Sequence, residues 1–337
     1  MKFRTLVTLL SSGQLPVLLS LVRATRQHHR LAFLGASVSS GLLRHLAAGP
    51  RSLDGLATDL GVDPSMRAGL EAWLQVGVAL GALRSTPAGY ALRGYLARQL
   101  ADPAHDAACA LVQEVTHLHT ALIAGAPQRL REARPFTLAD QDADVIARSS
   151  RIAEPVICEA LDTVLPAHGP ARLLEIGCGT AAYIRHAAAR NPDLTALGLE
   201  LQPEVATLAA ANVATWNLAH RVAIEAGDIR ERRPEPVFDV ATLHQNIYYF
   251  AVDERVGVLR HVGGFVKPGG RVLLTTFCQG GSAAVAVLNL WGAMTTGCGR
   301  LPTPAELVAQ LQDAGFRDIT HHRLIPGESF FAFVGTR

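Results

Sequence analysis

The chain has 337 residues, which is too long for one typical domain and about right for two. Its residues are 49% hydrophobic and 18% charged, so there is ample apolar material for large cores and no region with the composition of a disordered segment. A formal net charge of +2 gives little reason to expect a nucleic acid or an anionic membrane as a partner.

The cysteines are odd in number and widely spaced, and no two of them form a CxxC pair. They are Cys109, Cys158, Cys178, Cys278 and Cys298. This pattern argues against a disulfide framework and against a zinc-finger-like site. We therefore expect free thiols in a reducing compartment, and hence a cytoplasmic protein.

The first ten residues combine two basic side chains with an apolar run, as the start of a signal peptide does. However, polar residues, a glycine and a proline interrupt this run at positions 11–16, and no convincing small-residue cleavage site follows. The run is also too interrupted to span a bilayer. We expect an amphipathic helix that packs against the protein.

The region up to residue 92 is expected to be mostly helical. Leucine and valine recur at helical spacing over 16–48. Residues 51–62 predict a short helix, with Ser52 as its N-cap and Gly61 just past its end. A further helix at 63–78 and two short strands within 81–92 complete the element order of a winged helix.

Between this region and the first buried strand, more helices are expected. They cover 104–124 and 139–165, and a loop that contains Pro127 and Pro135 joins them. We place the domain boundary near Pro166, because the residues that follow introduce the first strand typical of a sheet interior.

Residues 172–180 are the most informative segment, because they predict a short apolar strand that runs into a glycine-rich turn. Gly177 and Gly179 allow the backbone to approach a ligand closely. The alanine-rich helix predicted over 181–190 offers unpaired amides and the positive end of a helix dipole. Such a turn alone is weak evidence, since it suits NAD, FAD and S-adenosylmethionine alike.

Three acidic residues sharpen this interpretation, because each follows or ends a predicted strand. Glu175 ends the first strand, where a carboxylate suits an ammonium group and would repel a pyrophosphate. Glu200 ends the next strand and can accept both ribose hydroxyls. Asp228 follows a third strand, where an acid can contact an adenine amino group. All three belong to the carboxyl edge at which open α/β sheets bind ligands.

Residues 170–337 resemble class I S-adenosylmethionine-dependent methyltransferases, through these acids, the Pro268-Gly269-Gly270 turn and a terminal strand pair. Residues 30–100 resemble, more loosely, the N-terminal winged-helix domain of small-molecule O-methyltransferases. The resemblance implies a Rossmann-like α/β domain at 166–337 and a helical, winged-helix domain at 1–165 that mediates a homodimer and roofs the substrate. It also implies a set of cofactor contacts: Glu175, Gly177, Gly179, Glu200, Leu201, Asp228, Ile229 and Leu243.

Methyl transfer needs an aligned nucleophile and, for some acceptors, a base. His244 is the best-placed histidine, because it ends the predicted fourth strand. It also matches the Leu-His with which the segment that carries the general-base histidine begins in winged-helix O-methyltransferases. The residues after it differ from that pattern and are more similar to a bacterial subgroup that includes α-keto-acid C-methyltransferases. We therefore leave three roles open for His244: base, substrate hydrogen-bond partner, or structural residue.

In that subgroup the corresponding histidine helps to bind a metal, so the resemblance also raises a divalent or ferric ion at His244. Cys298 is a candidate second ligand, although a lone cysteine is more often buried packing. Tyr248, Tyr249 and Trp291 are expected either to line an aromatic substrate cavity or to pack in the core.

The sequence thus predicts a methyltransferase of a small, specialised metabolite, with neither nucleic acid nor membrane as a partner. It leaves open the substrate and whether oxygen, carbon or nitrogen accepts the methyl group. One alternative is an NAD(P)-dependent oxidoreductase, which Ala181 at the usual third glycine and Glu175 disfavour. A second is a non-catalytic S-adenosylmethionine-binding regulator whose winged helix binds DNA. The predicted recognition helix, with a single arginine, does not favour that alternative.

Overall fold

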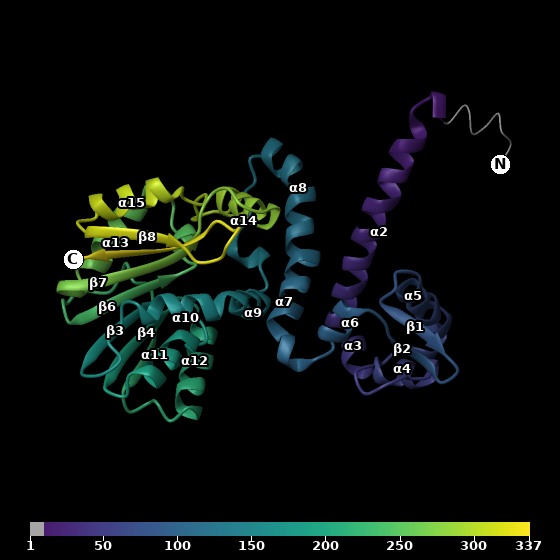
Figure 1. Ribbon diagram of the computed structural model, residues 1–337, viewed down its shortest axis with the longest axis horizontal. Helices are drawn as coiled ribbons and strands as arrows, with labels where there is room; N and C mark the ends of the chain where they lie inside the picture. The colour runs from purple at the N-terminus through teal and green to yellow at the C-terminus, as the bar shows by residue number, and fades with distance from the viewer. Residues whose placement is uncertain (1–9) are drawn as a thin grey trace. The chain divides into compact units, whose positions relative to one another are not determined.

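A computed structural model of the chain describes residues 10–337. The contacts divide it into two compact units (Figure 1). The N-terminal unit runs to Ala121 and includes Ala143–Ser150, and the C-terminal unit comprises Leu122–Asp142 and Arg151–Arg337. The domain limits expected from the sequence, 1–165 and 166–337, remain a prediction about which parts fold independently. The helix expected at the start of the chain lies largely outside the described residues.

The N-terminal unit is helical with one small hairpin. Its α-helices and strands are α2 (Gln14–Ser39), α3 (Leu42–His45), α4 (Leu53–Asp59), α5 (Arg67–Ala79), β1 (Leu83–Thr86), β2 (Gly89–Leu92), α6 (Tyr95–Gln99), α7 (Asp106–Glu114) and α9 (Ala143–Ser149). Its 3₁₀ turns are η1 (Pro64–Met66) and η2 (Pro103–His105). Ser52 accepts a hydrogen bond from the first turn of α4, and Gly61 is left-handed with φ 63°, so the predicted start and end of this helix are confirmed.

Two predictions about the middle of the chain are wrong. Pro127 lies inside α8 (Thr120–Arg131) and not in a loop; Leu122 and Ala126 on this helix are buried, and their packing stabilises it across the proline. A π-helical turn, η3 (Val115–His119), separates α7 from α8.

The helix expected over 139–165 is interrupted. It consists of η4 (Leu138–Asp140), α9, η5 (Ser150–Ala153) and α10 (Glu154–Asp162). Pro155 explains the last interruption, because a proline is favourable in the first turn of a new helix and unfavourable inside a continuous one.

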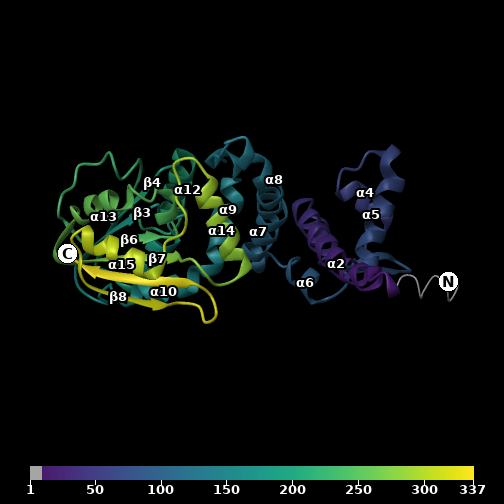
Figure 2. The ribbon, with the colours of Figure 1, turned by 90° about the horizontal axis from the view of Figure 1, so that it is seen from above.

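The C-terminal unit is built on a seven-stranded sheet in the order β5-β4-β3-β6-β7-β9-β8. The strands are β3 (Ala171–Ile176), β4 (Leu194–Glu200), β5 (Val222–Ala226), β6 (Phe238–His244), β7 (Val266–Phe277), β8 (Arg317–Arg323) and β9 (Phe330–Thr336). The β5-β4-β3-β6-β7 ladders are parallel, and β9 pairs antiparallel with both β7 and β8. Figure 2 shows β8 and β9 along one edge of the unit, close to the C terminus.

Helices cover both faces of this sheet. They are α10, α11 (Ala182–Arg190), α12 (Pro203–Thr215), η6 (Ile247–Tyr249), α13 (Arg255–Gly263), α14 (Ala283–Met294) and α15 (Pro304–Asp313). Because side chains alternate along a strand, Leu173 packs with α10, α11 and α12 on one face, whereas Leu174 packs with α13 and α15 on the other. Figure 1 shows α11 and α12 on one side of the strands and α13 and α15 on the other. None of the helices in the described part of the chain is both long and apolar enough to cross a membrane.

The order of the strands determines where a ligand binds. β3 lies between β4 and β6, so the chain leaves β3 toward one side of the sheet and later returns to its other side. In open α/β sheets the crevice outside the carboxyl ends of the strands at such a reversal is the ligand site. The predicted site residues follow these strand ends.

Candidate functional site

The turn after β3 has the conformation that its glycines predict. Gly177 and Gly179 are both left-handed, with φ of 68° and 52°, and Ala181 shares this conformation with φ 65° at the start of α11. The main-chain N–H of Gly177 and that of Cys178 donate to the carbonyl of Leu199 on β4, at 2.7 and 3.1 Å. The turn is therefore fixed against the neighbouring strand, with its remaining amides at the carboxyl edge.

Glu175 is the most unusual acid of the site. Its side chain is 1% exposed, and neither carboxylate oxygen has a hydrogen-bond partner within the described part of the chain. Burial, together with the nearby charge of Glu200, raises the pKa of Glu175 well above its ordinary value. A buried carboxylate without a partner is destabilising, so this arrangement favours a ligand that carries a positive charge or hydrogen-bond donors.

Glu200 ends β4 and stabilises the glycine turn. Its carboxylate accepts hydrogen bonds from the N–H of Gly179 at 2.9 Å and from that of Gln202 at 3.1 Å. A carboxylate offers about four acceptor positions, so Glu200 retains acceptor positions for the hydroxyls of a bound ribose. Leu201, the next residue, is 54% exposed and presents an apolar surface at the same edge.

Asp228 follows β5, but its carboxylate is covered. Arg230 donates to it through Nε and through a terminal nitrogen, the latter at 2.6 Å. This pairing is the main reason that the pKa of Asp228 lies below its ordinary value. Ile229, between the two, is 3% exposed and packs in the core. The sequence analysis did not identify Arg230. Its position two residues after Asp228 was the only available signal, and that spacing alone does not predict an ion pair.

His244 is the last residue of β6 and is 7% exposed. Its Nδ1 lies 2.9 Å from Oγ1 of Thr275 on β7, and the ring of Tyr183 lies 4.8 Å from its own ring, centroid to centroid. Its Nε2 has no hydrogen-bond partner among residues 10–337. Burial lowers the pKa of His244 to about 3, so the imidazole is neutral at physiological pH.

Asn246 is a second residue that the sequence analysis missed. Its Nδ2 donates to the carbonyl of Ile176 at 2.6 Å, which ties the end of β6 to the end of β3. A Cβ on Gly177 would lie only 2.8 Å from the same nitrogen, so this contact requires glycine at this position of the glycine turn. Leu243, which precedes His244, is fully buried and pairs in register with Ile176.

The predicted substrate residues lie on two segments, η6 and α14. Tyr248 and Tyr249 form part of η6, with ring centroids 4.9 Å apart, and Tyr248 is 7% exposed. Trp291 lies on α14, is 2% exposed and packs 6.0 Å from the ring of Phe136. Trp291 is thus integrated in the core, although its Nε1 has no partner in the described structure. Their contact with a substrate remains a prediction.

The residues present do not fit a metal site at His244. No group of three or more histidine, cysteine, aspartate or glutamate side chains that could hold a metal occurs in residues 10–337. Burial raises the pKa of the Cys298 thiol to about 11, which disfavours the thiolate that binds metals. We therefore derive no chemical step through a metal ion.

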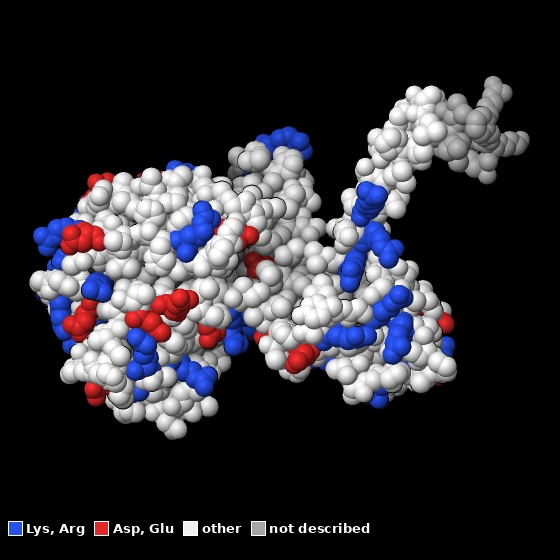
Figure 3. Space-filling view, in the orientation of Figure 1, with Lys and Arg blue, Asp and Glu red and all other residues white. Residues whose placement is uncertain are grey.

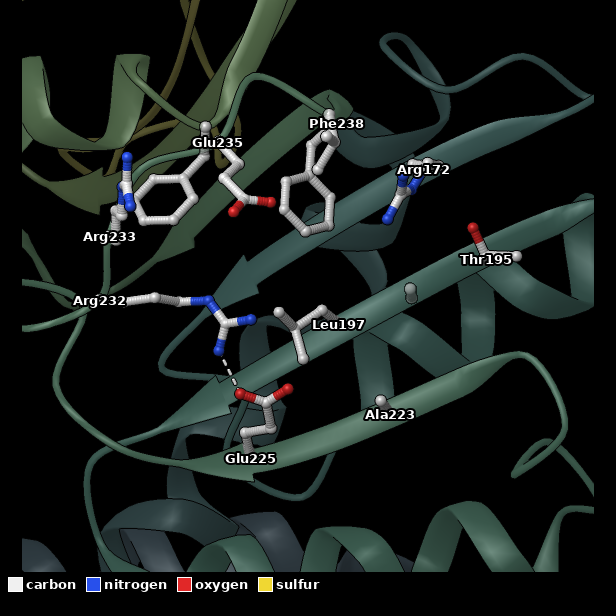
Figure 4. A pocket seen from close by; sticks show the side chains of 12 residues that line it. Arg172, Thr195, Leu197, Ala223, Glu225, Arg232, Arg233, Glu235 and Phe238 are labelled. Atoms are coloured by element: carbon white, nitrogen blue, oxygen red, sulfur yellow. Dashed lines mark hydrogen bonds and ion pairs between the residues drawn. The ribbon is translucent and has the colours of Figure 1, made fainter.

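A hollow of about 490 Å³ lies elsewhere on the sheet. Figure 4 shows its floor on β3, β4 and β5 and its wall on the segment that leads into β6. Arg232 and Glu225 pair across it. None of the predicted cofactor or catalytic residues lines this hollow.

Comparisons with known proteins agree with this geometry. Residues 174–272 match the protein family described as "Methyltransferase domain". The tetracenomycin polyketide synthesis 8-O-methyl transferase TcmO of Streptomyces glaucescens is 27% identical over 150 residues, which cover 43% of this chain and 44% of that protein. The alignment therefore spans less than half the length of this relative.

Solved structures match over nearly the whole chain. The mitomycin 7-O-methyltransferase MmcR superposes with a TM-score of 0.80 and 17% identity, over 97% of this chain and 100% of that chain. Human N-acetylserotonin methyltransferase, solved in complex with S-adenosylmethionine, gives a TM-score of 0.73 and 18% identity, over 96% and 98% of the two chains. At these identities the likeness shows the fold, which confirms the predicted mostly helical N-terminal region and the Rossmann-like sheet.

Proposed function

We propose that the chain is a class I S-adenosylmethionine-dependent methyltransferase that methylates an oxygen atom of a small specialised metabolite, and the match of residues 174–272 to a methyltransferase domain supports this. TcmO and MmcR, which are named for O-methylation in tetracenomycin and mitomycin chemistry, support an oxygen acceptor. Neither the oxidoreductase nor the DNA-binding regulator gains support from these matches.

The observation that carries the proposal is the buried, unpartnered carboxylate of Glu175 beside the glycine turn. An ammonium group such as that of the methionine moiety would supply the charge and donors that Glu175 lacks. Glu200 would hold the ribose hydroxyls, and Asp228 the adenine amino group. Leu201, Ile229 and the main chain at Leu243 would complete the cofactor contacts, together with the backbone at Gly177 and Gly179.

S-adenosylmethionine supplies a methyl group on a positively charged sulfur, which is a good leaving group. The chain's own residues then have to align the acceptor oxygen with the methyl carbon. We assign this role to His244: its neutral imidazole, fixed by Thr275, presents Nε2 as a hydrogen-bond partner for the acceptor. With a pKa of about 3 it is a weak proton acceptor. Tyr248, Tyr249 and Trp291 would bind the acceptor's aromatic body.

We further propose a homodimer formed through α2, in the cytoplasm. Five apolar residues of this helix are 47–64% exposed, and they are Val17, Leu18, Leu19, Leu21 and Val22. In Figure 3 the end of α2 beside the grey atoms shows no charged side chains. An exposed apolar face of this kind is typical of a protein interface. Sedimentation of the wild type beside a Leu18→Glu/Leu21→Glu variant tests the dimer, which should dissociate in the variant.

A binding titration tests the function. We expect the purified chain to bind S-adenosylmethionine and S-adenosylhomocysteine and not NADH. Glu200→Gln should weaken binding about tenfold or more, because hydrogen bonds to a charged group contribute about 1.5–3 kcal/mol. Glu225→Gln is the matched control, since Glu225 lies on β5 and pairs with Arg232.

The acceptor class is tested with a panel of phenols and S-adenosylmethionine. A mass increase of one CH₂ group on the hydroxyl, measured by mass spectrometry, would support the proposal. Binding of NADH without S-adenosylmethionine would refute it, and salt-dependent binding of duplex DNA without methyl transfer would favour a regulator.

A further inference from the structure

The guanidinium of Arg230 binds the carboxylate of Asp228, which is the acid that the proposed function assigns to the adenine amino group. Its main-chain N–H and Nε lie 2.9 and 3.1 Å from Oδ1 of Asp228, and its Nε and terminal nitrogen lie 3.0 and 2.6 Å from Oδ2. A carboxylate has about four acceptor positions. Three N–H groups make these four contacts, because Nε lies between both oxygens, so the guanidinium takes most of the acceptor capacity of Asp228 and competes with an adenine amino group for the rest.

The same guanidinium already contacts a second set of groups. Its other terminal nitrogen lies 3.5 Å from a carboxylate oxygen of Glu254, and its central carbon lies 5.7 Å from the ring centroid of Phe250. An acid and an aromatic face are both favourable partners for arginine. The Arg230 side chain is 48% exposed, so a turn from one acid toward the other would not require a rearrangement of the core.

We infer that Arg230 sets the affinity of the adenine subsite: adenine displaces its guanidinium from Asp228, and Glu254 and Phe250 receive it. This inference rests on the proposed function, since it needs Asp228 to contact adenine. The same pairing with Arg230 lowers the pKa of Asp228. Arg230 is thus a positioning residue, which acts on the cofactor through Asp228.

The size of the effect follows from the exposure of the pair. Partly exposed ion pairs contribute about 0.2–1 kcal/mol. The contact between Arg230 and Asp228 is bidentate, which places this pair at the upper end of that range. Removal of the competing guanidinium should therefore strengthen ligand binding about two- to fivefold. Removal of its second acid should weaken binding by a similar factor, because the displaced guanidinium then loses its partner.

Isothermal titration of the full chain with S-adenosylhomocysteine tests this inference. We expect Arg230→Ala to bind about two- to fivefold more tightly than the wild type, and Glu254→Gln to bind more weakly. The double variant should bind as Arg230→Ala does, because Glu254 acts only through the guanidinium. Arg230→Lys keeps the positive charge but cannot make the bidentate contact, so its affinity for S-adenosylhomocysteine should lie between those of Arg230→Ala and the wild type.

Arg233→Ala is the matched control, since Arg233 is exposed on the same segment and lines the hollow of Figure 4. It should leave the affinity unchanged. Weaker or unchanged binding by Arg230→Ala, or an effect of Glu254→Gln that persists in the double variant, would overturn the inference while the proposed function stands. If the wild type binds no S-adenosylhomocysteine at all, the proposed function itself fails.

Discussion

The buried imidazole of His244 should make the stability of the C-terminal unit depend on pH. In the unfolded chain a histidine has a pKa of about 6.5, whereas burial lowers the pKa of His244 to about 3 in the folded protein. Between these two values the unfolded chain binds a proton that the folded protein does not. The free energy of unfolding therefore falls as the pH is lowered through this window.

The magnitude follows from the difference between the two pKa values. One pKa unit corresponds to about 1.4 kcal/mol, so lowering the pH from 7 to 5 should remove about 2 kcal/mol from the free energy of unfolding. This is a large fraction of the total stability of a typical domain, about 5–15 kcal/mol. No neighbouring charge contributes to the shift, so the effect is a property of burial at this position.

Urea unfolding, followed by tryptophan fluorescence at pH 7 and at pH 5, measures this effect. The comparison is between the wild type and His244→Gln, and contributions from groups such as Glu175 cancel in the difference because both proteins contain them. We expect the difference in unfolding free energy to change by about 2 kcal/mol between the two pH values. His168→Gln, at an exposed histidine before β3, is the matched control. An equal difference at both pH values would refute the reasoning.

Three further predictions concern packing, capping and the acceptor. Gly198→Ala should destabilise the protein by about 1–3 kcal/mol and weaken S-adenosylhomocysteine binding, because its Cβ would lie 2.7 Å from Ile224 and 2.9 Å from Cys178 of the cofactor turn; Gly257→Ala, with no atom within 4 Å, is the control. Ser52→Ala should lower the unfolding free energy by about 1 kcal/mol, and Ser52→Asp should not. The pH profile of methyl transfer should shift with the pKa of each phenol tested; one inflection common to all phenols would contradict the role given to His244.

The first three strands of the sheet and their acids were predictable, because β3, β4 and β5 are short runs that each have an acid close to their carboxyl end. Glu175, Glu200 and Asp228 lie at the carboxyl edge for this reason, and the glycine turn precedes a helix as expected. Pro127 was misassigned because local propensity favours a break, whereas burial of its helix face favours continuation.

The partners of the site residues were not predictable from local sequence. His244 bonds Thr275, 31 residues further along the chain, and Asn246 bonds the carbonyl of Ile176, 70 residues before it. Such contacts depend on the register between neighbouring strands, which no short pattern encodes. The covering of Asp228 by Arg230 is local, but it depends on side-chain conformation, which spacing alone does not determine.

The low pKa of His244 bears on which acceptors the protein can use. When a hydroxyl is methylated, an O–C bond forms, the S–C bond breaks and the hydroxyl proton must leave. An imidazole whose conjugate acid has a pKa of about 3 takes up that proton unfavourably near neutral pH. An acceptor that ionises readily in water, such as a phenol on an electron-poor ring, needs no such base and would require only the orientation that we propose for Nε2 of His244. The burial that makes this imidazole a poor base thus favours acidic phenols over aliphatic alcohols as substrates.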